Sequence, residues 1–348
     1  MVILRSMAIV TSDHDSVRAG KLSTLSWQKA LKEAIRDPVE LCRTLQLPAE
    51  FEIGAEQAAA KFPVFAPKDF VAKMEVGNPS DPLLRQVLPV DEELLLAPGY
   101  VSDPVGDLAA QKTPGLIQKY HGRALAITTG RCAVHCRYCF RREYPYAEGP
   151  RSHREFAPLL QTIAADSTIE EILLSGGDPL TVVDEGLSDL IQQLENIEHL
   201  RRLRIHTRLP IVIPQRVTDA LLESLQRTQL VSLVVVHANH PAEIDCHVAA
   251  ALQRIVEAGI PVLNQSVLLR GVNDCAKTLI KLSEKLINCR VMPYYLNQLD
   301  RVNGAAHFEV KVDVGKAIIA EMRTRLPGYA VPRYVQEHAG DQHKRPLA

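Results

Sequence analysis

Residues 124–140 read ALAITTGRCAVHCRYCF and join a short apolar segment directly to a group of three cysteines. The apolar part, ALAITT at 124–129, has the length and composition of a buried β-strand. Five similar segments follow, separated by stretches of helical character. They are EILLSG (171–176), LRIHT (203–207), LVSLVVVH (230–237), IPVLNQS (260–266) and VMPYYL (291–296).

These segments are apolar at consecutive positions, a pattern typical of strands that are covered on both faces. Strands of this kind alternating with helices predict an α/β fold with a parallel sheet. We expect the six units to close into a partial (β/α)6 TIM-like barrel, although a doubly wound open sheet would give the same local pattern. In either fold the chemistry lies at the carboxyl ends of the strands, where this chain carries polar residues.

Three regions are predicted along the chain. Residues 1–113 form an N-terminal helical region and a connector rich in Pro and Gly, residues 114–325 form the barrel, and residues 326–348 form a C-terminal tail that closes the active site. Helical spacing of apolar residues predicts a first helix over 26–34, and Asp37-Pro38 begins a second one.

The composition is that of an ordinary globular protein, with 46% hydrophobic and 23% charged residues. Forty basic and forty-one acidic residues leave a net charge of −1, which argues against a nucleic-acid partner. The first ten residues, MVILRSMAIV, are too short and too polar a stretch for a secretory or membrane segment, so we expect a cytoplasmic location and no membrane partner.

The segment RCAVHCRYCF (131–140) places Cys132, Cys136 and Cys139 three and then two residues apart. Three thiolates can hold a 4Fe-4S cluster and leave one iron open to a substrate. The alternative is a structural zinc site in which His135 or another residue supplies the fourth ligand. The remaining four of the seven cysteines are scattered, and clustering of only three favours metal binding over disulfides.

This spacing, with Tyr138 before the last cysteine, resembles the signature of the radical S-adenosylmethionine (SAM) enzymes. The resemblance implies that SAM binds the open iron and is cleaved to a 5′-deoxyadenosyl radical. The turn SGGDP (175–179) resembles the glycine motif of that family and assigns Ser175, Gly176, Gly177 and Asp178 to SAM binding.

A narrower resemblance, to the lysine 2,3-aminomutase family, extends over most of residues 75–345. It rests on segments that occur in the order of that family: NPSDPLLRQ (78–86), CFRR (139–142), SGGDPL (175–180), PQRVT (214–218), NHP (239–241), NQSVLLRGVNDC (264–275) and PYYLNQLD (293–300). The similarity is greatest to the short branch that supplies β-lysine for modification of translation elongation factor P. Longer relatives complete a metal site at the position of Cys275, whereas we expect a free thiol here.

The resemblance implies that pyridoxal phosphate is bound covalently by Lys344. Its phosphate is expected to lie near Arg123 and Lys119, although the family usually has arginine at the latter position. His237 and Gln265 match positions that line the cofactor cavity, and both could equally be hydrogen-bonded structural residues.

Substrate residues are implied in the same way. Arg141 matches the arginine that binds the substrate carboxylate, while Asp300 and Glu337 match the acidic residues that bind the side-chain ammonium of lysine. The family has aspartate where this chain has Glu337.

The implied activity is an isomerase, a lysine 2,3-aminomutase that converts L-α-lysine to β-lysine, with the R configuration, by an adenosyl radical mechanism. The implied partners are lysine, a reductant protein, and elongation factor P with its lysyl-transferring enzyme. Two alternatives stay open: an aminomutase for another amino acid such as glutamate or arginine, and a non-catalytic iron-sulfur or zinc protein.

Overall fold

The computed structural model describes residues 25–150 and 155–348. Residues 1–24 lie outside this range, and with them the N-terminal segment from which a cytoplasmic location was predicted. None of the helices in the described ranges is long and apolar enough to cross a membrane.

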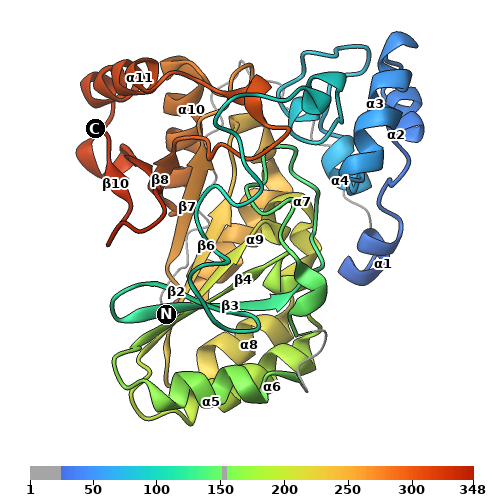
Figure 1. The fold of residues 1–348 in the computed structure, drawn as a ribbon. Coiled ribbons are helices and arrows are strands. Elements are labelled where there is room, and N and C mark those ends of the chain that lie inside the picture. Colours follow the sequence, from blue (N-terminus) through green and yellow to red (C-terminus); the bar gives the residue numbers. More distant parts are fainter. Residues whose placement is uncertain (1–24, 151–154) are drawn as a thin grey trace, which may run out of the picture.

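One sheet of ten strands forms the centre of the molecule (Figure 1). The strands are β1 (Gln111–Thr113), β2 (Leu116–Tyr120), β3 (Arg123–Thr129), β4 (Glu171–Gly176), β5 (Arg202–Thr207), β6 (Val231–His237), β7 (Val262–Val267), β8 (Met292–Asn297), β9 (Arg333–Gln336) and β10 (Arg345–Pro346).

The strands are neighbours in the sheet in the same order as in the sequence. From β3 to β9 every pairing is parallel, while β1, β2 and β10 add antiparallel pairings at the two edges. A doubly wound sheet would reverse its strand order at a switch point. The unbroken order, with no pairing between β1 and β10, therefore confirms the incomplete barrel.

Helices cover the outer face of this sheet. In β5 and β7 buried and partly buried residues alternate, which differs from the expectation of strands covered equally on both faces. The fully buried strand residues face the helices. On the helix side, α6 contributes the buried residues Leu187, Leu190, Ile191 and Leu194. The barrel helices are α5 (Ala157–Ala165), α6 (Asp184–Glu195), α7 (Leu209–Val212), α8 (Asp219–Arg227), α9 (Cys246–Glu257), α10 (Ala276–Asn288) and α11 (Val312–Arg325).

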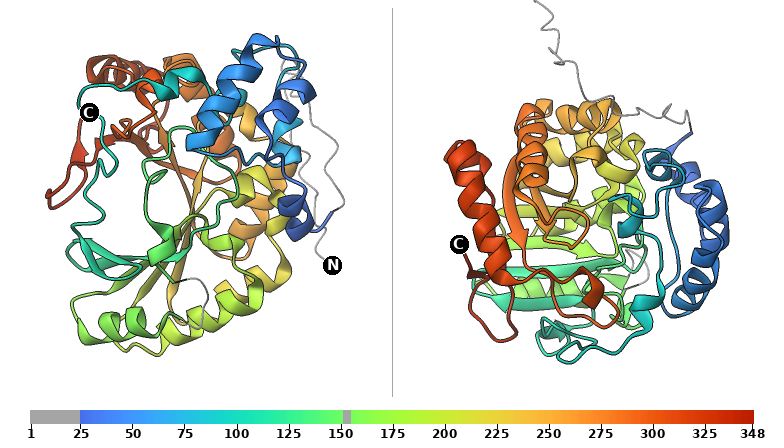
Figure 2. Two further views of the ribbon diagram at one scale, coloured as in Figure 1. Left: turned by 45° about the vertical axis from the view of Figure 1, so that its right-hand side comes forward. Right: turned by 90° about the horizontal axis from the view of Figure 1, so that it is seen from above.

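Four helices near the N-terminal end of the described residues form a group beside the barrel. They are α1 (Trp27–Lys32), α2 (Pro38–Thr44), α3 (Glu50–Lys61) and α4 (Lys68–Val71). Ser26 caps α1 and Asp37 caps α2, where Pro38 occupies the first turn. Both ribbon views place these helices on the side of the barrel opposite α11 (Figures 1 and 2).

Candidate active site

A cavity of about 300 Å³ lies within the barrel. It is reached by side chains from the cluster loop, from the ends of β4 to β8 and from the C-terminal residues. Every residue that the sequence analysis assigns to iron, SAM, pyridoxal phosphate or substrate lines this one cavity. Residues from positions 119 to 344 of the chain are thus brought together, which the order of motifs alone does not guarantee.

The three cysteines of residues 131–140 face the cavity and lie close enough to one another to interact electrostatically. Burial raises the pKa of the Cys132 thiol, and the other two cysteines raise it further. Burial together with Cys136 raises the pKa of Cys139 to about 11. The Cys132 and Cys139 thiols are therefore neutral without metal, and a metal cation that binds them displaces their protons.

Within the described ranges, no three Cys, His, Asp or Glu side chains are grouped tightly enough to hold a single metal ion. His135, the possible zinc ligand, hydrogen-bonds through Nδ1 to the Pro63 carbonyl at 2.8 Å and stacks on Phe62. One ring nitrogen of His135 is thus occupied by a backbone carbonyl, and the three thiols remain the candidate ligands of a cluster. Cys275 is exposed, and its sulfur lies 3.1 Å from the Thr278 hydroxyl oxygen.

The SGGDP turn packs directly against the start of the cluster loop. Gly177 N donates to the Thr129 carbonyl at 2.8 Å, and Asp178 N donates to the Arg131 carbonyl at 2.7 Å. A Cβ on Gly177 would overlap the Arg131 carbonyl oxygen, and Gly176 has a φ of +117°. The two glycines thus let the turn approach the loop, while the Asp178 carboxylate accepts from Thr207 and Arg208 and ties β4 to β5.

Lys344 reaches the cavity because of the hairpin at the end of the chain. β10 pairs antiparallel with β9 so that Arg345 lies opposite Gln336, and the next residues along, Lys344 and Glu337, face each other. Their side chains form an ion pair. Glu337 also pairs with Lys119 at 2.9 Å. Burial raises the pKa of Glu337, but the two lysines outweigh it and hold the pKa below its usual value.

Arg141 is held by Asp107, a residue of the connector. The Arg141 Nε donates to Asp107 Oδ2 at 2.6 Å, and Nη1 contacts the Ser175 hydroxyl at 3.3 Å. Nη2 forms no hydrogen bond or ion pair with a residue in the described part of the chain. Burial raises the pKa of Asp107, but Arg141 and Lys119 lower it by more, so the carboxylate stays ionised. Arg141 is therefore fixed in place with its Nη2 amino group left for an anion.

Asp300 lines the cavity without a hydrogen bond or ion pair from its carboxylate to any described residue. Burial raises its pKa to about 7, an increase that Lys344 opposes and Glu337 supports. A carboxyl group placed in this way gains from a cation that enters the cavity. This is the chemistry expected of a residue that binds an ammonium group.

The two expected phosphate ligands differ in their surroundings. The Arg123 guanidinium lies over the Tyr120 ring at 4.7 Å and has no acidic partner in the described ranges. Lys119 instead contacts Asp107 at 2.5 Å and the Val105 carbonyl at 2.8 Å, in addition to Glu337. Arg123 is thus free to bind an anion, whereas the Lys119 charge is already balanced by two carboxylates.

His237 and Gln265 also differ. The His237 Nε2 hydrogen-bonds to the Tyr138 hydroxyl at 2.8 Å, and burial together with Arg208 lowers the pKa of His237 to about 3. Gln265 faces the cavity and makes no side-chain hydrogen bond to the described residues. The neutral His237 therefore supports Tyr138, and Gln265 is available to a ligand.

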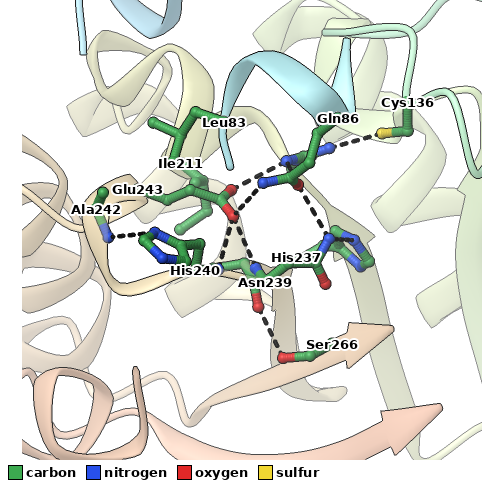
Figure 3. A network of polar contacts seen from close by, with 12 residues as sticks. Leu83, Gln86, Cys136, Ile211, His237, Asn239, His240, Ala242, Glu243 and Ser266 are labelled. Atoms are coloured by element: carbon green, nitrogen blue, oxygen red, sulfur yellow. Dashed lines mark hydrogen bonds and ion pairs between the residues drawn. The ribbon is translucent and has the colours of Figure 1, made fainter. Parts of the chain in front are cut away.

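Sequence reasoning missed two parts of this site. Asp107 lies in the connector, where the segment PVGD (104–107) gave only a turn signal. A buried network of Gln86, Arg208, Asn239 and Glu243 surrounds Tyr138. Figure 3 shows Gln86, Asn239 and Glu243 of this network. Gln86 and Asn239 lie in segments that carry the family resemblance, and Arg208 directly follows β5. These positions are the sequence signal that could have identified the network.

The residues present fit the cofactors that the resemblance implies. The cavity offers three thiols for a cluster with an open iron, a close-packed glycine turn beside them, a lysine for a carbonyl cofactor and a free guanidinium for its phosphate.

The family of the chain is clear from comparison with known proteins. Residues 126–282 match the Radical SAM superfamily. An L-lysine 2,3-aminomutase of Escherichia coli is 47% identical over 322 residues, which are 92% of this chain and 94% of that protein. The L-lysine 2,3-aminomutase of Haemophilus influenzae is 45% identical, with coverage of 92% and 94%. That of Clostridium subterminale is 34% identical, with coverage of 92% and 77%.

Identity of this extent over nearly the whole chain agrees with the barrel and with the cysteine-lined cavity inside it. The chain belongs to the L-lysine 2,3-aminomutase family of radical SAM proteins.

Proposed function

We propose that this protein is a lysine 2,3-aminomutase that converts L-α-lysine to (R)-β-lysine. One observation carries the proposal: the unpartnered carboxyl group of Asp300 faces the cavity that Lys344 and the three cysteines also line. When bound, the cluster with SAM supplies a 5′-deoxyadenosyl radical, and pyridoxal phosphate supplies a π-system for the migrating nitrogen.

The residues of the chain divide the work between binding and orientation. Cys132, Cys136 and Cys139 hold the cluster, and the turn at Gly176 and Gly177 lets SAM approach it. Lys344 anchors pyridoxal phosphate. The Glu337 carboxylate holds the Lys344 ammonium in the cavity until the cofactor replaces this contact.

Substrate is held at its two ends. Arg141, kept in position by Asp107, binds the carboxylate of lysine through its Nη2 amino group. Asp300 binds the ammonium at the other end. Glu337 adds negative charge to the same region, although two lysines already balance that charge, so we assign Asp300 the larger part in recognising a basic amino acid.

The product is proposed to serve the modification of elongation factor P. This part of the proposal rests on the resemblance of the chain to the branch that supplies β-lysine for this modification. A reductant protein is required to supply the electron, and the lysyl-transferring enzyme would receive β-lysine.

The test is an anaerobic assay of the reconstituted protein with dithionite, SAM, pyridoxal phosphate and one amino acid at a time. We expect 5′-deoxyadenosine and β-lysine from L-lysine, and no β-amino acid from L-glutamate or L-arginine. Chiral analysis gives the configuration. Cys136→Ala is the matched control and should lose both the brown chromophore and turnover.

Cleavage of SAM without any β-amino acid would contradict the aminomutase proposal. A preparation that holds metal and yields no 5′-deoxyadenosine would instead support the non-catalytic alternative.

A further inference from the structure

Arg208 lies immediately after β5, with its backbone fixed by the Asp178 carboxylate. Asp178 accepts hydrogen bonds from the N–H groups of Arg208 at 2.7 Å and Leu209 at 3.2 Å. The residue is 5% exposed and lines the cavity. A buried guanidinium in a protein interior needs several acceptors, so its contacts define its role.

The guanidinium reaches one of the cluster cysteines. Its Nη1 donates to the Cys136 Sγ at 2.8 Å and to the Tyr138 hydroxyl at 2.8 Å. Its Nη2 donates to Gln86 Oε1 at 2.6 Å and Glu243 Oε2 at 3.0 Å. Figure 3 shows Cys136 at one end of this network and Glu243 at the other.

Glu243 is fixed as firmly as Arg208. Its Oε1 accepts from the backbone N–H groups of Asn239 at 2.8 Å and His240 at 2.9 Å, and from Gln86 Nε2 at 3.2 Å. Burial raises the pKa of Glu243, but Arg208 and these hydrogen bonds outweigh it, so the carboxylate stays ionised. A fixed cation thus touches the sulfur, and a fixed anion lies behind that cation.

We propose that Arg208 raises the reduction potential of the iron-sulfur cluster by donating an N–H···S hydrogen bond to Cys136, and that Glu243 limits this effect. The inference rests on the cluster of the proposed function. One electron passes from the reductant to the cluster and no covalent bond changes in this step. The added negative charge is stabilised by a nearby cation and by donors to the thiolate sulfur.

The other buried arginines near the loop do not have this geometry. Arg137 bonds to the Glu93 carboxylate and to the carbonyls of Phe62 and Pro63. Arg216 bonds to the carbonyls of Leu180 and Val182 and pairs with Asp184. Both donate hydrogen bonds to backbone carbonyls, whereas Arg208 donates one hydrogen bond to a sulfur atom. Arg208 is therefore a positioning residue that acts on the cluster through Cys136.

The test is the midpoint potential of the reconstituted protein, measured by a redox titration followed by electron paramagnetic resonance, without turnover. Arg208→Gln should favour the oxidised cluster about tenfold, which is about 59 mV downward for one electron. Arg208→Lys, which keeps the charge, should shift the potential less. Glu243→Gln should shift it upward, because it leaves the cation unbalanced.

Arg204→Gln is the matched control, since Arg204 precedes Arg208 by four positions and pairs with Glu171 at 2.6 Å. It should leave the potential unchanged. Iron and sulfide content is determined for each protein. Unchanged potentials, or shifts of the same sign in Arg208→Gln and Glu243→Gln, would overturn the inference and leave the proposed function intact.

Failure of all the Arg208 and Glu243 variants to take up iron, while the unmodified protein does, would also overturn it, because the network would then be a structural requirement. Failure of the unmodified protein to take up a cluster would overturn the proposed function itself.

Discussion

Lys344 and Glu337 form an ion pair because the antiparallel pairing of β9 and β10 places them opposite each other. The ion pair holds the residue before β10 at the cavity wall. Glu337 forms a second ion pair with Lys119. A lysine near a chain end would ordinarily be solvated and mobile. Here the hairpin and the carboxylate hold its amine in the cavity, which is the condition for linking a carbonyl cofactor.

Replacement of Lys344 tests this assignment. Lys344→Ala and Lys344→Arg should both bind pyridoxal phosphate without a covalent link, since neither side chain has a primary amine. The measurement is borohydride reduction followed by mass spectrometry of the C-terminal peptide. Lys316→Ala, a change at an exposed lysine of α11, should keep the reduced adduct on Lys344. An adduct on another lysine in the unmodified protein would refute the assignment.

Arg123 and Lys119 should contribute differently to cofactor binding. Arg123 has no acidic partner in the described ranges and is free for a phosphate, so Arg123→Gln should weaken pyridoxal phosphate binding about tenfold or more. The same variant should bind pyridoxal, which lacks the phosphate, as the unmodified protein does. Absorbance titrations measure both constants.

Lys119→Gln provides the comparison. Loss of the Lys119 charge leaves Asp107 and Glu337 with one cation fewer each. The binding of pyridoxal and the binding of pyridoxal phosphate should therefore weaken to a similar extent. If only pyridoxal phosphate weakened in Lys119→Gln, the phosphate would lie at Lys119 and the division proposed between the two residues would be wrong.

The barrel could be predicted from the sequence because its signals are local. Each of the six apolar runs has the length of a strand, and all six occur in the sheet. The short strands β9 and β10 could not be found in this way, because they span four and two residues. They are stabilised by pairing with β8 and with each other, which no local pattern encodes.

The candidate site likewise contains residues with a local sequence signal and residues that only the fold brings together. The cysteines and the glycine turn are predicted from motifs and Lys344 from the family resemblance, and the structure places all of them around one cavity. Asp107 holds Arg141 across 34 positions and Gln86 holds Arg208 across 122. Contacts of this range depend on the fold, so the sequence predicts candidate chemical groups but not the residues that hold them in place.

Gly177 should tolerate no side chain. Because a Cβ would overlap the Arg131 carbonyl oxygen, Gly177→Ala must push the SGGDP turn away from the cluster loop. We expect lower thermal stability and weaker SAM binding, measured by calorimetry on the reconstituted protein. Gly328→Ala, where nothing lies within 4 Å of the added carbon, should change neither. Normal SAM affinity in Gly177→Ala would show that the close approach of turn and loop is not needed.

Asp300 should make lysine binding depend on pH. Burial raises its pKa to about 7, so the carboxyl group is largely protonated at pH 6 and ionised at pH 8. An ammonium binds the ionised form, so binding at pH 6 must first release a proton. The affinity for L-lysine should therefore increase as the pH rises from 6 to 8, by up to about tenfold per unit below the pKa. Calorimetry of the anaerobic protein without reductant measures this.

Asp300→Asn should remove both the affinity and its pH dependence. A desolvated ion pair that loses one partner costs on the order of 3–5 kcal/mol, equivalent to a dissociation constant raised by about two orders of magnitude or more. L-norleucine, which has no side-chain ammonium, should bind the variant and the unmodified protein alike and without this pH dependence. Equal losses for lysine and norleucine would place Asp300 outside ammonium recognition, and a pH dependence that persisted in Asp300→Asn would assign the titration to another group.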